Sequence, residues 1–279
     1  MSSTDDGKKM PLLDHLIELR QRLLYSVAAL FVAFLVCFYF AQDLYNFLVQ
    51  PLADLLIERA EDKERAPRLI YTALTEVFFT HVKVAFFFGA FITCPVFLTQ
   101  IWMFVAPGLY KHERKAFGPF LVATPFLFFL GGALVYYVIF PLAWRFFLAF
   151  ETGGGEGTLP IELEAKVAEY LSLVMKLIFA FGLCFQLPVI MTLMARVGLA
   201  TAEGMARKRK YAIVGVFVVA AIFTPPDPIS QISLALPIIL LYEISIYMAK
   251  LVEKKQRQRE AEEEAAEQAE ADSGDVPAT

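Results

Sequence analysis

Six long stretches without a charged residue constrain the fold of this chain more than any other feature. They cover residues 23–42, 84–110, 116–144, 177–195, 211–226 and 228–242. A helix needs about 20 apolar residues to cross a bilayer, so the first four stretches are long enough and the last two, at 16 and 15 residues, are short. The chain is 58% hydrophobic and has a mean hydropathy of +0.56, which leaves no room for a soluble catalytic domain. The pattern predicts an all-α integral membrane protein with six transmembrane helices.

Lys and Arg are concentrated in alternate connecting segments. Residues 1–22, 107–116, 196–210 and 250–279 hold 17 of them, whereas residues 42–76, 145–168 and 225–228 hold six. By the positive-inside rule, the richer segments face the cytoplasm. We therefore predict a multi-pass protein of the cytoplasmic (inner) membrane with both its N- and C-termini in the cytoplasm.

Prolines interrupt the apolar stretches throughout the chain. They are Pro95, Pro119, Pro125, Pro141, Pro188, Pro225, Pro226, Pro228 and Pro237. Each removes a backbone hydrogen bond and bends its helix. Membrane helices tolerate such breaks where neighbouring groups satisfy the freed carbonyls. The sequence therefore predicts kinked helices that form a concave bundle.

Three regions follow from these patterns. Residues 1–22 form a cytoplasmic N-terminal segment, in which a stripe of leucines predicts an amphipathic helix that leads into the first span. Residues 23–250 form the six-helix transmembrane domain. Residues 251–279 are a charged cytoplasmic tail, which we expect to continue the last helix briefly and then to be disordered. In the first outer loop, the mixed charges at 56–65 indicate a short exposed helix that caps the outer face.

The sequence contains no recognisable catalytic motif. There are three His and three Cys, and the cysteines Cys37, Cys94 and Cys184 lie within apolar stretches, as buried cysteines do. We expect no metal site, no cofactor and no enzymatic activity. A net charge of −4 and a pI near 5.5 argue against nucleic acid as a partner.

Several charged residues leave two interpretations open. Glu18 and Arg22 are four residues apart, the spacing of an ion pair within one helix. Lys83 and Lys176 lie within spans, each seven residues after an acid, and either reach the outer interface or line an ion path. Glu243 either lies at the membrane interface or contacts a neighbouring helix.

Three segments together resemble the TatC family, the receptor subunit of the twin-arginine translocase. They are His-Leu-Ile-Glu-Leu-Arg-Gln-Arg-Leu at 15–23, Gln-Ile-Trp-Met-Phe-Val-Ala-Pro-Gly-Leu-Tyr-Lys-His-Glu-Arg at 100–114, and Phe-Thr-Pro-Pro-Asp-Pro-Ile-Ser-Gln at 223–231. The resemblance covers roughly residues 11–250, and the segments occur in the order found in the family. Two rivals have less support: a secondary transporter predicts internal repeats, and an intramembrane hydrolase predicts a catalytic pair within the spans.

The resemblance implies a receptor for twin-arginine signal peptides of folded precursor proteins. It assigns the binding of the paired arginines to Glu18 and Glu113 at the cytoplasmic face. The same resemblance implies that four further residues shape that site, namely Arg20, Phe104, Pro107 and Tyr110.

The family resemblance also implies partners within the membrane. These are single-span proteins of the TatA and TatB type, further copies of the chain itself, and the lipid bilayer, with transport driven by the proton-motive force. The implied contacts with partner helices are Gln186, Thr224 and Gln231, with Asp227 as a further candidate. Relatives often have Glu where this chain has Gln186, so a titratable role is absent here. A bond from Gln186 to a carbonyl freed by Pro188 is the alternative.

Overall fold

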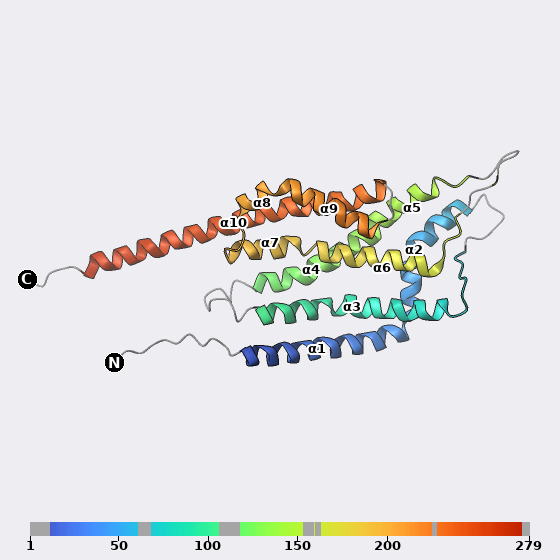
Figure 1. The fold of residues 1–279 in the computed structure, drawn as a ribbon, viewed down its shortest axis with the longest axis horizontal. Helices are drawn as coiled ribbons and strands as arrows, with labels where there is room; N and C mark the ends of the chain where they lie inside the picture. The colour runs from blue at the N-terminus through green and yellow to red at the C-terminus, as the bar shows by residue number, and fades with distance from the viewer. Residues whose placement is uncertain are drawn as a thin grey trace, which may run out of the picture.

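Long helices run alternately in opposite directions and lie side by side (Figure 1). The computed structural model describes residues 12–60, 68–105, 118–152, 159, 163–224 and 228–274. The α-helices within these ranges are α1 (Leu12–Tyr39), α2 (Ala41–Ala60), α3 (Glu76–Val105), α4 (Gly118–Leu134), α5 (Phe140–Leu148), α6 (Val167–Cys184), α7 (Leu187–Arg196), α8 (Ala202–Arg207), α9 (Arg209–Phe223) and α10 (Pro228–Gly274). The start of α1 and the end of α10 lie at one end of the bundle, which we call the terminal end, and α2 lies at the opposite end, the α2 end.

The helices account for six passes along the bundle. Five of these contain stretches long and apolar enough to cross a membrane, within α1, α3, α4–α5, α6–α7 and α10. The sixth is α9, which has only 15 residues. The prediction of a helical membrane protein with six spans is confirmed. The prediction that the sixth span is short is wrong, because α10 continues without a break past Glu243, whose carboxylate pairs with Arg209 of α9 at 2.8 Å.

Two of the predicted kinks lie where prolines remove backbone donors. The fourth span breaks between α6 and α7 at Phe185 and Gln186, just before Pro188. In the third span a π-helical turn, Val135–Ile139, joins α4 to α5 just before Pro141. A widened turn before proline accommodates its ring and its missing N–H. The concavity of the whole bundle stays a prediction.

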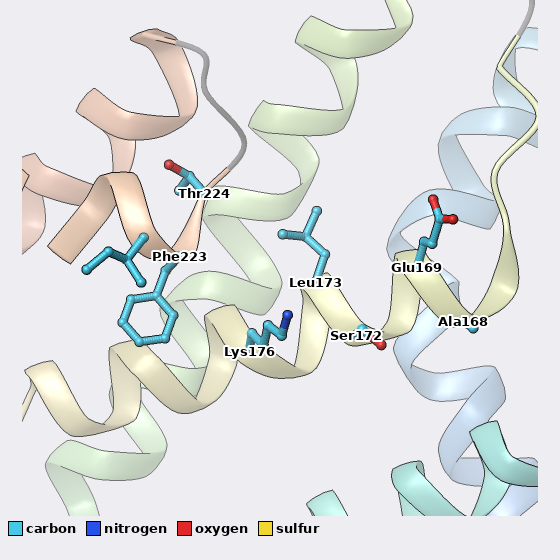
Figure 2. A pocket seen from close by; sticks show the side chains of 8 residues that line it. Ala168, Glu169, Ser172, Leu173, Lys176, Phe223 and Thr224 are labelled. Atoms are coloured by element: carbon cyan, nitrogen blue, oxygen red, sulfur yellow. The ribbon is translucent and has the colours of Figure 1, made fainter. Parts of the chain in front are cut away.

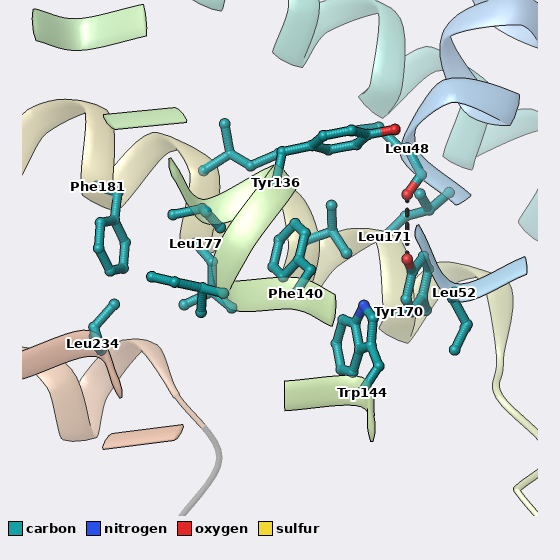
Figure 3. Packing of buried hydrophobic residues seen from close by; sticks show 14 of the residues in the cluster. Leu48, Leu52, Tyr136, Phe140, Trp144, Tyr170, Leu171, Leu177, Phe181 and Leu234 are labelled. Atoms are coloured by element: carbon teal, nitrogen blue, oxygen red, sulfur yellow. Dashed lines mark hydrogen bonds between the residues drawn. The ribbon is translucent and has the colours of Figure 1, made fainter. Parts of the chain in front are cut away.

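The first outer loop differs from the exposed helix that its charges suggest. Helix α2 begins at Ala41, before the charged stretch, and buries Leu48, Leu52 and Leu55 in the main hydrophobic cluster. This cluster also takes in residues of α5, α6 and α10 (Figure 3). The apolar spacing of four and three residues gives α2 a buried face, so it is part of the core. Residues 61–65 of the predicted helix lie outside the described residues.

Two tyrosines hold α2 against the bundle by its backbone. Pro51 lies inside α2 and has no N–H, so the carbonyl of Phe47, four residues earlier, loses its helical partner. The Tyr136 hydroxyl donates to this carbonyl at 2.6 Å. The Tyr170 hydroxyl donates to the neighbouring Leu48 carbonyl at 3.2 Å (Figure 3). The proline thus creates an acceptor that α2 uses to dock.

Removing the Tyr136 hydroxyl is expected to destabilise the protein. Tyr136→Phe keeps the ring stacked on Phe47, at 4.5 Å between centroids, but leaves a carbonyl without its donor. The expected loss is about 1–3 kcal/mol in the free energy of unfolding, measured by denaturant unfolding in detergent. In a Pro51→Ala background the new N–H can serve the Phe47 carbonyl, so the same substitution should cost less. Equal losses in the two backgrounds would contradict this role of Tyr136.

The tail of the protein also differs from its prediction. Helix α10 runs to Gly274, well beyond the brief continuation expected from its composition. Residues 251–270 are rich in Ala, Glu, Lys, Arg and Gln, which are strong helix formers. Contacts fix the start of this extension: Glu253 accepts from the Ala202 backbone N–H at 2.6 Å, and the Gln256 amide donates to the Arg196 carbonyl at 2.7 Å. This part of the predicted tail therefore packs against the connection between α7 and α8.

Candidate functional site

At the terminal end of the bundle, an acid on α1 is held by a base one turn away. The Arg22 guanidinium donates through Nε to Oε1 of Glu18 at 3.0 Å and through Nη2 to the same oxygen. Nη1 of Arg22 also donates to the Gln100 side chain of α3 at 3.4 Å. The ion pair predicted from the spacing is therefore present, and Arg22 also joins the start of α1 to the end of α3.

The pairing leaves half of the Glu18 carboxylate unused. Both bonds from Arg22 reach Oε1, whereas Oε2 is buried and has no hydrogen-bond partner in the described part of the chain. The side chain as a whole is 23% exposed. A buried carboxylate oxygen without a donor costs free energy. A ligand that displaces the groups covering Oε2 could therefore donate a bond to it while Arg22 stays bonded to Oε1.

The structure places only some of the other predicted binding residues. Arg20 lies on α1 two residues after Glu18 and is exposed, and Phe104 lies half-buried in the last turn of α3. The contact between Arg22 and Gln100 brings the ends of α1 and α3 together. Three predicted residues, Glu113, Pro107 and Tyr110, lie outside the described residues. The meeting of Glu18 and Glu113 therefore stays a prediction.

Gln186 lies between α6 and α7 and is occupied inside the bundle. The residue is 4% exposed, and its side-chain Nε2 donates to the Thr124 carbonyl of α4 at 2.9 Å. The structure thus favours the internal bond over a contact with a partner. The acceptor differs from the one expected, because Pro188 frees the carbonyl of Cys184 and not that of Thr124. Gln186 joins the break in the fourth span to the third span.

Replacing Gln186 by Leu tests this interpretation. Gln186→Leu keeps the size of the side chain but removes the donor to Thr124. We expect a loss of about 1 kcal/mol in stability, the usual contribution of a polar bond within a membrane, measured by unfolding in detergent micelles. Crosslinking to a single-span partner should be unchanged. Reduced crosslinking at unchanged stability would instead assign Gln186 to the partner contact.

The second predicted contact region lies at the α2 end. Thr224 follows α9 and is 9% exposed, and its hydroxyl donates to the Ala220 carbonyl at 2.8 Å. Gln231 lies in the first turns of α10 and donates to the Phe217 carbonyl at 3.2 Å. The Thr224 bond closes the end of α9 itself, whereas the Gln231 bond joins the start of α10 to α9. Asp227 lies outside the described residues.

Sequence reasoning missed two residues, Gln100 and Thr124, that accept hydrogen bonds from Arg22 and Gln186. Gln100 appears in the family-like segment, but nothing in its spacing predicts its bond to Arg22, 78 residues away. Thr124 offers its backbone carbonyl, which no residue pattern can reveal. The i, i+4 spacing was the one local signal that identified the Glu18 pair. Where the structure describes the chain, no group of three His, Cys, Asp or Glu could hold a metal ion.

Comparisons with known proteins agree on one family. The family model described as Sec-independent protein translocase protein (TatC) matches residues 14–237. The chain is 50% identical to the Sec-independent protein translocase protein TatC of Magnetococcus marinus over 261 residues, which cover 94% of this chain and 92% of that protein. It is 40% identical to the TatC protein of Escherichia coli strain K12 over 250 residues, covering 90% and 92%.

A solved structure supports the same assignment. The crystal structure titled as the twin arginine translocase receptor TatC superposes with a TM-score of 0.71 at 37% identity. The match covers 85% of this chain and 99% of that one. Sequence and fold therefore agree over most of the length of both proteins. This multi-pass membrane protein belongs to the TatC family of Sec-independent protein translocase proteins.

Proposed function

We propose that the protein is the receptor of a twin-arginine translocase, which binds twin-arginine signal peptides of folded precursors at the terminal end of the bundle. Its relatives carry the name of a translocase protein, and the superposed crystal structure is titled as a receptor. The role is transport and not catalysis. In this proposal the terminal end faces the cytoplasm and the protein resides in the cytoplasmic membrane, in accord with its distribution of Lys and Arg.

The proposal rests on the surroundings of the Glu18 carboxylate. Its Oε2 is buried and lacks a donor in the described residues, while Arg22 fixes the position of the group through Oε1. A guanidinium from the signal peptide would supply the missing charge-assisted bond. Glu113 would supply the second carboxylate, with Arg20, Phe104, Pro107 and Tyr110 around the two acids. Two acids held apart can engage two arginines at once.

The apolar part of the signal peptide and the partner proteins would bind within the membrane. We place the single-span TatA and TatB type helices at Thr224 and Gln231, near the short α9, with Asp227 beside them. A contact between Gln186 and the partner would require the loss of its bond to Thr124, so this proposal leaves Gln186 out of the partner contact. Further copies of the chain complete the complex. The proton-motive force supplies the energy, since each charge that moves through 100 mV contributes about 2.3 kcal/mol.

A signal peptide with two lysines in place of its arginines tests the receptor role. Lysine keeps the charge but cannot form the paired, planar bonds that a guanidinium makes to a carboxylate. We expect binding to the purified protein to weaken roughly fivefold or more, corresponding to about 1 kcal/mol. Fluorescence anisotropy of labelled peptides gives both affinities. Equal affinity for the two peptides would contradict recognition of the paired arginines.

A further inference from the structure

An open cavity with both polar and apolar walls lies between α6 and the end of α9, toward the α2 end. Its volume is about 440 Å³, and Figure 2 shows the side chains that line it. From α6 come Glu169, Ser172 and Lys176, and from the end of α9 come Phe223 and, just after it, Thr224. The cavity therefore combines a carboxylate, hydroxyl groups and an ammonium group with an apolar edge.

Lys176 lies at an unusual depth for a charged residue. Helix α6 begins at Val167, so Lys176 is about 13 Å along the helix at 1.5 Å per residue. The span Val167–Arg196 has 30 residues, or about 45 Å, against a hydrocarbon core of about 30 Å. If this span is centred in the bilayer, Lys176 lies within the outer edge of the hydrocarbon. A charge there needs an anion or water.

The neighbouring helix ends at the same level. Phe223, the last residue of α9, lies opposite Lys176 across the cavity (Figure 2). The 15 residues of α9 rise only about 22 Å, less than the thickness of the hydrocarbon core. A short span draws the bilayer surface inward beside it. Lipid headgroups next to α9 are therefore expected near the depth of Lys176.

The charges of the cavity are ordered by depth. Glu169 is seven residues before Lys176, which places it on the same face of α6 and about 10 Å nearer the α2 end. Its only ion-pair partner in the described chain, Lys166, is 3.5 Å away, and the two side chains are 75% and 43% exposed. Such an exposed pair contributes little. Lys176 has no hydrogen-bond or ion-pair partner within the described ranges, so both charges are available to a ligand.

The similar pair on α3 offers no such site. Glu76 precedes Lys83 by seven residues, but its carboxylate already accepts from the backbone N–H groups of Thr72 at 2.9 Å and Ala168 at 3.4 Å. Lys83 is exposed but is absent from the lining of the cavity. The same spacing of seven residues therefore leaves both charges available to a ligand on α6 but not on α3. Lys83 therefore serves as a matched control for Lys176.

We propose that this cavity binds the headgroup of an ethanolamine phospholipid from the leaflet at the α2 end. Its phosphate would accept bonds from the Lys176 ammonium and the Ser172 hydroxyl. Its primary ammonium would donate to the Glu169 carboxylate nearer the surface. In such a lipid the phosphate lies deeper than the ammonium, which is the order of the two protein charges. The bound headgroup would hold the bilayer surface inward beside α9, independently of any signal-peptide binding.

Lipid binding by variants tests the site. Purified protein in dodecyl maltoside is titrated with dioleoyl phosphatidylethanolamine, and native mass spectrometry counts the lipids bound. We expect Lys176→Leu to weaken the tightest binding step roughly tenfold, the effect of one lost charge-assisted bond, and Lys176→Arg to retain it. Glu169→Gln should abolish the preference for phosphatidylethanolamine over phosphatidylcholine, because the choline ammonium has no N–H to donate.

The control and competition arms decide the assignment. Lys83→Leu should bind the lipid like the unchanged protein, and inorganic phosphate should not displace it. Equal lipid binding by Lys176→Leu and the unchanged protein would overturn the proposal. Displacement by inorganic phosphate would overturn it as well, by showing a site for free phosphate. A thermal unfolding curve for each variant ensures that only folded protein is compared.

Discussion

Glu18→Ala is expected to weaken the binding of a twin-arginine signal peptide at least tenfold. The substitution removes the one carboxylate oxygen at the start of α1 that is buried without a donor in the described residues. A hydrogen bond to a charged group contributes about 1.5–3 kcal/mol, which corresponds to roughly ten- to 150-fold in affinity. Peptide titration followed by fluorescence anisotropy measures the change. Glu18→Gln should rescue little, since a neutral amide oxygen makes a weaker bond to a guanidinium.

Arg22→Ala provides the matched control, because Glu18 and Arg22 are bonded to each other in the structure. If Glu18 serves the signal peptide, removal of Arg22 frees Oε1 as well, and binding should be retained. If the pair only stabilises α1, the two substitutions should weaken binding equally. Equal weakening by the two substitutions would contradict the receptor site, and so would unchanged peptide binding by Glu18→Ala.

The same prediction applies to the second acid, Glu113. Glu113→Ala should also weaken peptide binding at least tenfold, because it removes a charge-assisted bond of the same kind. The effects of Glu18→Ala and Glu113→Ala should be non-additive if the two acids share one guanidinium, and additive if each binds its own arginine. A double-mutant cycle therefore shows whether the two acids bind the same arginine of the signal peptide or one arginine each.

The spans were predictable because their signal is local. An uncharged stretch can be read directly from the chain, and the breaks near Pro141 and Pro188 follow from a missing N–H. The length of α10 was not predictable from the same rule. Its span passes Glu243, and only the contact with Arg209 on another helix explains how that charge is accommodated. The packing of α2 was not predicted, because the charged residues at its end suggested an exposed helix although its leucines are spaced for burial.

In the candidate site, too, local features were predictable from the sequence and long-range contacts were not. The Glu18 pair follows from a spacing of four residues, and the role of Glu18 follows from a family resemblance. The bond from Arg22 to Gln100 and the bond from Gln186 to Thr124 join residues 78 and 62 positions apart. Such contacts depend on how α1 meets α3 and how α4 meets α7. Helix packing determines them, and no single segment encodes that packing.

The packing of α4 on α6 leads to the second prediction with a large effect. A Cβ atom at Gly131 of α4 would lie 2.7 Å from the Phe181 carbonyl oxygen of α6 and 2.9 Å from the Phe185 ring. Phe181 is fully buried, and a backbone oxygen cannot move aside as the end of a flexible side chain can. Gly131 therefore sets the distance between the two helices, as small residues do in membrane bundles.

Gly131→Ala is expected to lower the free energy of unfolding by about 1–3 kcal/mol, the usual effect of overpacking. Helix separation should also lengthen the bond from Gln186 to Thr124, two turns from Gly131 on α4, so the loss should shrink in a Gln186→Leu background. Gly215→Ala on α9 is the matched control. A Cβ there meets nothing within 4 Å, so the higher helix propensity of Ala should leave stability unchanged or raise it by up to about 1 kcal/mol. Denaturant unfolding in detergent measures both variants, and equal stability of the two would show that α4 and α6 do not depend on contact at Gly131.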